Sequence, residues 1–124
     1  MSIKKKILII EDEKTLRFLM VQALVDAGFE VEEAIDGEQG LQKIKENKPD
    51  LILLDLLLPG INGYEVLSKI NRDSDLESIP IIILSNLGQE EEIKKGMGLG
   101  AVDYMIKAHF TLEEIIVRIK KILK

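Results

Sequence analysis

The sequence predicts an α/β fold in which five parallel strands form one sheet with helices on both faces. Short apolar runs of Ile, Leu and Val alternate along the chain with longer stretches in which apolar residues recur every three or four positions. The short runs suit strands that are buried on both faces, and the longer stretches suit amphipathic helices. Regular alternation of the two is typical of a parallel sheet whose connections are helices.

Five segments carry the strand signal. Three nearly continuous apolar runs cover residues 7–10, 50–54 and 81–84, and weaker patterns cover Glu30–Ala34 and Asp103–Ile106. Because the run at 50–54 is the most apolar, we expect it near the centre of the sheet. The functional side chains of such sheets lie just after the strands, at their carboxyl ends.

Apolar residues at helical spacing predict a helix after each strand. The helical patterns centre on residues 16–27, 41–44, 66–70, 93–97 and 112–123. The first pattern predicts that Leu19 lies in the buried stripe, and Gly28 ends that helix. Thr111 and Glu114 form a capping box that opens the last helix.

The fourth helix is predicted to be the weakest. Ile93 and Met97 mark this helix by their spacing, but Gly96, Gly98 and Gly100 crowd its end. Glycine costs about 1 kcal/mol relative to alanine inside a helix. This segment is therefore a candidate for an element that changes conformation.

Length and composition favour one domain over residues 1–124 that works in the cytoplasm. Hydrophobic residues make up 46% of the chain, aromatic residues only 4%, and charged residues 31%. No apolar stretch is long enough for a signal peptide core or a membrane span, so we expect no membrane association. The net charge of −5 makes direct nucleic-acid binding unfavourable. The absence of cysteine excludes disulfides, thiolate nucleophiles and cysteine-based zinc sites.

Polar residues follow four of the predicted strands. Glu11 and Asp12 follow the first strand, Asp55 the third and Ser85 the fourth, and Lys107 ends the fifth. Parallel strands bring these residues to one edge of the sheet. Three carboxylates in one cleft repel each other unless a cation joins them, and oxygen ligands suit Mg²⁺. A lysine and a hydroxyl beside them would bind a further anion, so the set predicts a phosphoryl site with Asp55 as nucleophile.

Each of these residues also has an ordinary structural interpretation. An acidic pair before a helix can be its cap and first turn, and Asp55 can cap the loop before Pro59. Ser85 can be a turn residue and Lys107 a surface lysine. A nucleotide site is disfavoured, because the first strand leads into acidic residues and neither glycine-rich phosphate-binding motif occurs.

Three segments of the chain resemble response-regulator receiver domains of two-component signalling, of the chemotaxis-regulator type. They are Ile7 to Glu13, Leu51 to Asp55 with Leu58 to Gly63, and Gly100 to Lys107. The motifs keep their order and spacing over the whole chain. The resemblance implies a flavodoxin-like sheet of strand order 2-1-3-4-5.

The resemblance also implies roles for individual residues. Asp55 would accept a phosphoryl group from a phosphohistidine, and Lys107 would pair with that group. Ser85 would move towards it and Tyr104 would turn inward, which alters the face made by the fourth helix, fifth strand and fifth helix. Mg²⁺ would be held by Glu11, Asp12, Asp55 and the backbone carbonyl of Leu57.

The expected partners are a sensor histidine kinase or phosphotransfer protein and a downstream output protein. Phe18, Val21 and Val25 form a second apolar line on the first helix, which is either a docking face for the kinase or a partly buried surface under loops. The chain is expected to be a monomer or a phosphorylation-dependent dimer. It would catalyse its own phosphorylation and dephosphorylation without being a turnover enzyme.

The chain departs from the family pattern beside the site. Ala108 stands where proline usually follows the lysine, one residue is inserted before Phe110, and Asn86 stands where a very small residue is common. A phosphorylation-independent interaction module is therefore the alternative function. An aspartyl-phosphate phosphohydrolase is a third possibility, although Leu57 stands where such enzymes carry a second acid.

Overall fold

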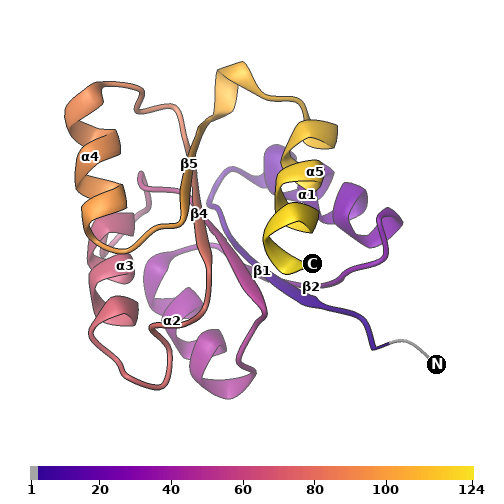
Figure 1. Ribbon diagram of the computed structural model, residues 1–124, viewed down its shortest axis with the longest axis horizontal. Helices are drawn as coiled ribbons and strands as arrows, with labels where there is room; N and C mark the ends of the chain where they lie inside the picture. The colour runs from indigo at the N-terminus through magenta and orange to yellow at the C-terminus, as the bar shows by residue number, and fades with distance from the viewer. Residues whose placement is uncertain (1–2) are drawn as a thin grey trace.

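The computed structural model describes residues 3–124 and contains five strands and five α-helices (Figure 1). In chain order they are β1 (Lys6–Ile10), α1 (Lys14–Asp26), β2 (Glu30–Ala34), α2 (Gly37–Glu46), β3 (Leu51–Leu54), α3 (Gly63–Asn71), β4 (Ile81–Ser85), α4 (Glu90–Gly98), β5 (Asp103–Ile106) and α5 (Leu112–Leu123). A short 3₁₀ turn, Lys107–His109, links β5 to the loop before α5. Within residues 3–124, no helix is both long and apolar enough to cross a bilayer.

The strands form one parallel sheet of order β2-β1-β3-β4-β5. This arrangement confirms the predicted α/β class, the flavodoxin-like strand order and the central position of β3. All four residues of β3 are buried, as are all five of β4. The order reverses direction at β1, so the carboxyl ends of β1 and β3 lie side by side at the switch point where α/β proteins place their sites.

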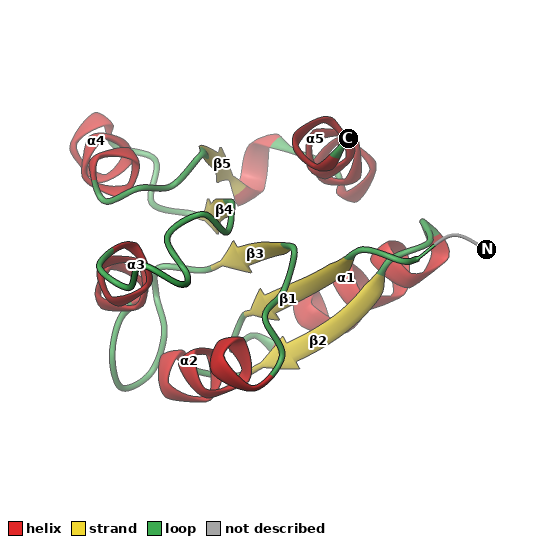
Figure 2. Ribbon diagram, turned by 60° about the horizontal axis from the view of Figure 1, so that its bottom comes forward, coloured by secondary structure: helices red, strands yellow, loops and turns green. Residues whose placement is uncertain are grey.

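Helices cover both faces of the sheet. Figure 2 shows α1 and α5 on one face and α2, α3 and α4 on the other. Alternate strand residues feed two separate apolar cores: Ile7 and Ile9 pack towards α1 and α5, whereas Leu8 and Ile10 pack towards α2 and α3. The continuous apolar runs of the sequence therefore arise from strands that serve two cores at once.

One residue predicted to be buried is exposed instead. Leu19 of α1 is 47% exposed, whereas Met20 and Leu24 supply the buried side of α1. The apolar face of α1 is wider than the strip the sheet can cover. A spacing rule finds the face of a helix but not the width of the contact.

The glycines of α4 allow close packing rather than only weakening the helix. A Cβ atom on Gly96 would lie 2.5 Å from Cδ1 of Ile83 and 3.3 Å from the Tyr104 ring. Gly100 has a φ of +111°, and a Cβ there would meet the Asn71 side chain. Glycine at position 96 lets α4 sit directly against β4 and β5, and Gly100 lets the turn after α4 pass close to the end of α3.

Candidate phosphoryl site

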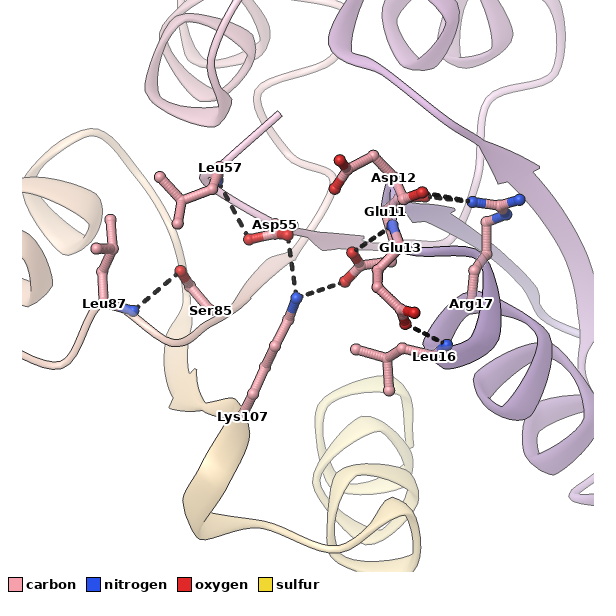
Figure 3. A network of polar contacts seen from close by, with 10 residues as sticks. All are labelled: Glu11, Asp12, Glu13, Leu16, Arg17, Asp55, Leu57, Ser85, Leu87 and Lys107. Carbon is pink, nitrogen blue, oxygen red and sulfur yellow. Dashed lines mark hydrogen bonds and ion pairs between the residues drawn. The ribbon is translucent and has the colours of Figure 1, made fainter. Parts of the chain in front are cut away.

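The strand ends bring the predicted residues together at one edge of the sheet. Figure 3 shows Glu11 and Asp12 after β1, Asp55 after β3, Ser85 at the end of β4 and Lys107 after β5. Glu11, Asp55 and Ser85 are buried, and Asp12 is exposed. All five predicted site residues therefore lie at one edge of the sheet, although four separate segments supply them.

Lys107 joins the two buried carboxylates. Its Nζ atom lies 2.7 Å from Oε1 of Glu11 and 3.0 Å from Oδ2 of Asp55 (Figure 3). Glu11 is only 2% exposed, so its charge depends on such a partner. The departure at Ala108 does not keep the lysine from the site, because the Lys107–His109 turn carries the side chain to it.

Burial and pairing shift the acid–base behaviour of this cluster. Burial raises the pKa of Glu11 above its usual value, despite the opposing hydrogen bond from Lys107. Burial also lowers the pKa of Lys107, but its contacts with Glu11 and Asp55 outweigh that effect and leave the pKa raised. Lys107 therefore stays protonated at neutral pH and acts as the internal counter-ion of the site.

The acidic side chains are arranged as a set of oxygen ligands. Glu11, Asp12 and Asp55 each offer one carboxylate oxygen, and these oxygens lie within 4.8 Å of one another. Such a donor set fits a hard divalent cation, which takes oxygen ligands and keeps several waters. The cluster could therefore hold a metal ion. The Leu57 carbonyl remains a predicted further ligand.

The helix-cap interpretation of the acidic pair does not hold. The cap of α1 is Glu13, whose side chain accepts a hydrogen bond from the Leu16 amide. Glu11 instead accepts a hydrogen bond from the Glu13 amide at 3.0 Å. Glu13 supplies the acceptor that the helix end requires. The carboxylates of Glu11 and Asp12 gather instead beside that of Asp55.

Asp55 is held by the backbone of its own loop. Its Oδ1 atom accepts a hydrogen bond from the Leu57 amide at 3.2 Å. A Cβ atom on Gly63 would lie 2.4 Å from the Asp55 carbonyl oxygen and 2.5 Å from Cα of Leu56. Glycine at position 63 therefore lets α3 begin directly behind Asp55, which keeps the nucleophile candidate in place.

The loop after β4 is held by two hydroxyl groups and connects the site to α4. Oγ of Ser85 accepts a hydrogen bond from the Leu87 amide at 3.2 Å, and the Tyr104 hydroxyl donates to the Leu87 carbonyl. Tyr104 is half-buried and already points inward. Burial raises the pKa of Tyr104 to about 12, so its phenol keeps the proton that it donates.

Arg17 takes part in the site although the sequence reasoning did not select it. Its Nη1 atom donates to the carbonyls of Glu11 at 2.8 Å and Asp12 at 3.3 Å, and its Nε atom donates to Glu33 at 3.0 Å. The sequence does offer one signal that could have selected Arg17: it is an arginine in the first turn of the helix that follows an acidic loop. The contacts with two carbonyls become visible only when the helix is placed.

The predicted docking residues lie on the outer side of α1. Phe18 and Val25 are 60% and 50% exposed, and Val21 is partly buried. Phe18 and Val21 line a shallow groove with Lys14, Arg17, Gln22 and Glu33. The alternative of burial under loops is excluded for Phe18 and Val25, and their docking role remains a prediction.

Comparison with known proteins agrees with this geometry. A family model described as the response regulator receiver domain matches residues 7–120. The phosphate regulon transcriptional regulatory protein PhoB of Pseudomonas aeruginosa is 41% identical over 120 residues, which are 97% of this chain and 52% of that protein. PhoB of Rhizobium meliloti is 36% identical over 119 residues, with 96% and 52% coverage. The chain thus spans about half the length of these curated relatives.

Solved structures show the same fold. A putative response regulator from Chloroflexus aurantiacus superposes with a TM-score of 0.91, at 35% identity and 98% coverage of both chains. A CheY-like receiver domain protein from Methanospirillum hungatei gives a TM-score of 0.90 at 28% identity, with 98% of this chain and 94% of that chain covered. Family model, sequence relatives and structures agree, and the chain belongs to the response regulator receiver domain family.

Proposed function

We propose that the protein is a phospho-switch in which Asp55 accepts a phosphoryl group from the phosphohistidine of a sensor histidine kinase or phosphotransfer protein. The observation that carries this proposal is the buried Asp55 carboxylate, held by the Lys107 ammonium and the Leu57 amide beside two further carboxylates. The proposed output is a change in the face made by α4, β5 and α5 that a downstream protein recognises.

The transfer step follows from the chemistry of the groups present. An oxygen of the Asp55 carboxylate attacks the phosphorus atom, the P–N bond to the donor imidazole breaks, and the imidazole leaves with the bonding electron pair and takes up a proton from solvent. The product on Asp55 is an acyl phosphate. Lys107 is already within hydrogen-bond distance of Asp55 and can neutralise part of the charge on the transferred group.

Glu11, Asp12, Asp55 and the Leu57 carbonyl are the proposed ligands of Mg²⁺. The cation would supply charge neutralisation and orientation of the phosphoryl oxygens. Glu11 and Asp12 hold no other proposed role in the reaction. Lys107 would exchange its contact with Glu11 for the phosphoryl group, since the cation would replace it as the counter-ion of Glu11.

Ser85 and Tyr104 are proposed to carry the signal to α4. A phosphoryl group on Asp55 offers a stronger acceptor than any present beside Ser85, so its hydroxyl would turn to donate there. That turn removes the acceptor of the Leu87 amide and changes the loop to which Tyr104 is bonded. The α4 face would respond because this loop leads directly into the helix.

The first experiment is intact mass spectrometry after incubation with Mg²⁺ and acetyl phosphate. We expect one added phosphoryl group on the natural chain and none on Asp55→Asn, which keeps the side-chain shape but lacks the nucleophilic carboxylate. Addition to both chains would move the acceptor elsewhere. Addition to neither, with Mg²⁺ bound, would favour the phosphorylation-independent interaction module.

A turnover assay separates the switch from an enzyme. The proposal expects no multiple turnover of a phosphate ester with Mg²⁺, because no second acid stands at Leu57 to protonate a leaving group. Sustained release of phosphate from an ester would favour the phosphohydrolase instead. Mass photometry or light scattering with and without acetyl phosphate decides between a monomer and a phosphorylation-dependent dimer.

Kinase docking is proposed for Phe18, Val21 and Val25 of α1. Phe18→Glu should reduce phosphoryl transfer from a histidine kinase roughly tenfold or more, because it places a charge in an apolar contact. Transfer from acetyl phosphate should be unchanged. Val117→Glu is the matched control, since Val117 is 59% exposed, almost as much as Phe18, but lies on α5. Equal loss with both donors would indicate misfolding and not a docking defect.

A further inference from the structure

Arg17 connects three parts of the molecule that meet at the proposed cation site. Its guanidinium contacts the backbone of the loop after β1 through the carbonyls of Glu11 and Asp12, and it contacts Glu33 of β2 through Nε. The side chain is only 13% exposed, whereas Glu33 is 48% exposed. Arg17 itself lies in the first turn of α1, so one side chain joins this helix, the loop and the neighbouring strand.

The loop that Arg17 holds carries two of the three carboxylates of the cluster. Glu11 is tied in place from several sides: its amide donates to the Ala34 carbonyl at 3.0 Å, and its carboxylate meets Lys107 and the Glu13 amide. Asp12 is exposed, and among residues 3–124 its carboxylate has no hydrogen-bond donor. The direction of the Asp12 side chain therefore depends on the backbone, which Arg17 contacts at the Asp12 carbonyl.

The shape of the guanidinium suits this role better than a simple positive charge does. Its planar group presents several N–H donors in a fixed arrangement and can serve two carbonyls and a carboxylate together. Glu33 balances the charge of Arg17 at 3.0 Å, so the pair adds little net positive potential near the cluster. The main effect of Arg17 on the cluster is therefore to fix the geometry of the loop after β1.

We propose that Arg17, supported by Glu33, is a positioning residue for the cation site, which holds the Glu11–Asp12 backbone so that both carboxylates face Asp55. This inference rests on the proposed function, because it takes the acidic cluster to be a divalent-cation site. Groups that orient metal ligands typically change affinity by about 10- to 100-fold when they are removed.

Positioning and simple charge repulsion predict opposite results. If Arg17 acted only through its positive charge, removing it would strengthen binding of a cation. If Arg17 positions the ligands, Arg17→Ala should weaken Mg²⁺ binding by about tenfold or more. Arg17→Lys, which keeps the charge but loses the planar group, should lie between the natural chain and Arg17→Ala. Glu33→Gln should weaken binding less than Arg17→Ala, because the guanidinium keeps its carbonyl contacts.

The test is an NMR titration of the unphosphorylated protein with MgCl₂, followed at the amides of Glu13 and Leu57. The chain has no tryptophan, so this readout replaces fluorescence quenching. The matched control is Glu32→Gln, which removes a partly buried ion pair between Lys6 of β1 and Glu32 of β2 and should leave the dissociation constant unchanged. Circular dichroism and urea unfolding identify any variant that is not folded, in which case Arg17→Lys and Glu33→Gln decide.

The outcomes separate this inference from the proposed function. If the natural chain binds Mg²⁺ and Arg17→Ala binds it equally or more tightly, the positioning role is wrong while the cation site stands. If the natural chain does not bind Mg²⁺ at all, the cation site and the role of Arg17 both fail. A loss in Arg17→Ala that Arg17→Lys partly restores, with Glu32→Gln unchanged, supports the inference.

Discussion

The loop after β1 and the loop after β4 both lead from a buried strand into a helix, but they are held in different ways. The first loop is fixed by charged groups: Lys107 contacts Glu11, Arg17 contacts two carbonyls, and the Glu13 side chain caps α1. The second is held by two hydroxyl groups, those of Ser85 and Tyr104, which both bond to the backbone of Leu87.

The helices that follow repeat this difference. The cap residue of α4, Gln89, makes no side-chain hydrogen bond, and the helix relies on glutamates in its first turn, which favour the positive end of its dipole. A neutral hydrogen bond contributes only about 0.5–1.5 kcal/mol net, and charge-assisted contacts contribute more. The β1 loop is therefore suited to hold ligands still, and the β4 loop to change its contacts at low cost.

The lifetime of the phosphorylated state tests the chemistry between these loops, and here we expect the largest effect. Leu57 lies beside Asp55, and Leu87 lies beyond Ser85 on the neighbouring loop (Figure 3). Neither side chain can orient a water molecule for attack on an acyl phosphate. Phosphate release should therefore take minutes or longer, and Leu57→Asn should speed it about tenfold or more. Leu57 is 58% exposed, so the substitution should not affect folding. Loss of the phosphoryl group from the natural chain within seconds would contradict this expectation.

The inward position of Tyr104 can be tested by its titration. Burial moves the pKa of Tyr104 from 10.0 to about 12. In Tyr64→Phe, which leaves Tyr104 as the only tyrosine, the midpoint of the absorbance rise at 295 nm should stay clearly above pH 10. It should lie below the value of the natural chain, because the Tyr64 charge also raises the pKa of Tyr104. The raised value also means that the contribution of this phenol to stability is present below pH 10 and is lost as the pH rises through about 12.

Tyr104→Phe is the control for that measurement. This substitution should remove the absorbance change of the Tyr104 phenol at high pH. It should also remove the loss of stability that ionisation of this phenol causes at high pH. A midpoint near pH 10 in Tyr64→Phe would mean that the Tyr104 phenol lies in solvent and not against the Leu87 carbonyl.

Packing of α4 gives the next largest effect. Gly96→Ala should destabilise the protein by about 1–3 kcal/mol, because the new methyl group overlaps Ile83 and crowds Tyr104. Gly98→Ala, on the same helix with nothing within 4 Å of the added Cβ, should stabilise it by about 0.5–1 kcal/mol. Urea unfolding measures both changes. Equal effects of the two substitutions would show that α4 does not pack closely on the sheet.

The caps give the smallest effect and act on both loops. Glu13→Ala should cost about 1 kcal/mol by removing the acceptor of the Leu16 amide, and Gln89→Ser should add up to about 1 kcal/mol by supplying one to α4. Chemical denaturation of the two variants measures the changes. If Gln89→Ser stabilises α4 and also slows phosphorylation by acetyl phosphate, motion of the β4 loop accompanies the reaction. If phosphorylation is unchanged, motion of the β4 loop is not required for the reaction.

Much of the fold and the site could be predicted from residue patterns because each depends on local rules. Continuous apolar runs indicate strands buried on both faces, and parallel strands must place Glu11, Asp55 and Lys107 at one edge. Thr111 and Glu114 form the predicted capping box, since both partners lie within one turn. The family resemblance added the strand order, which local patterns do not contain.

The tertiary structure decided what depends on the distance between segments. Leu19 belongs to the apolar spacing of α1 yet is exposed, because the width of the sheet limits what the helix can bury. Gly96 weakens a helix in isolation yet allows close packing against Ile83. Arg17 reaches Glu33, sixteen residues further along the chain, only because α1 packs against β2. Local chemistry therefore determined which residues form the strands and which polar residues follow them, whereas packing between distant segments decided which side chains hold the site in shape.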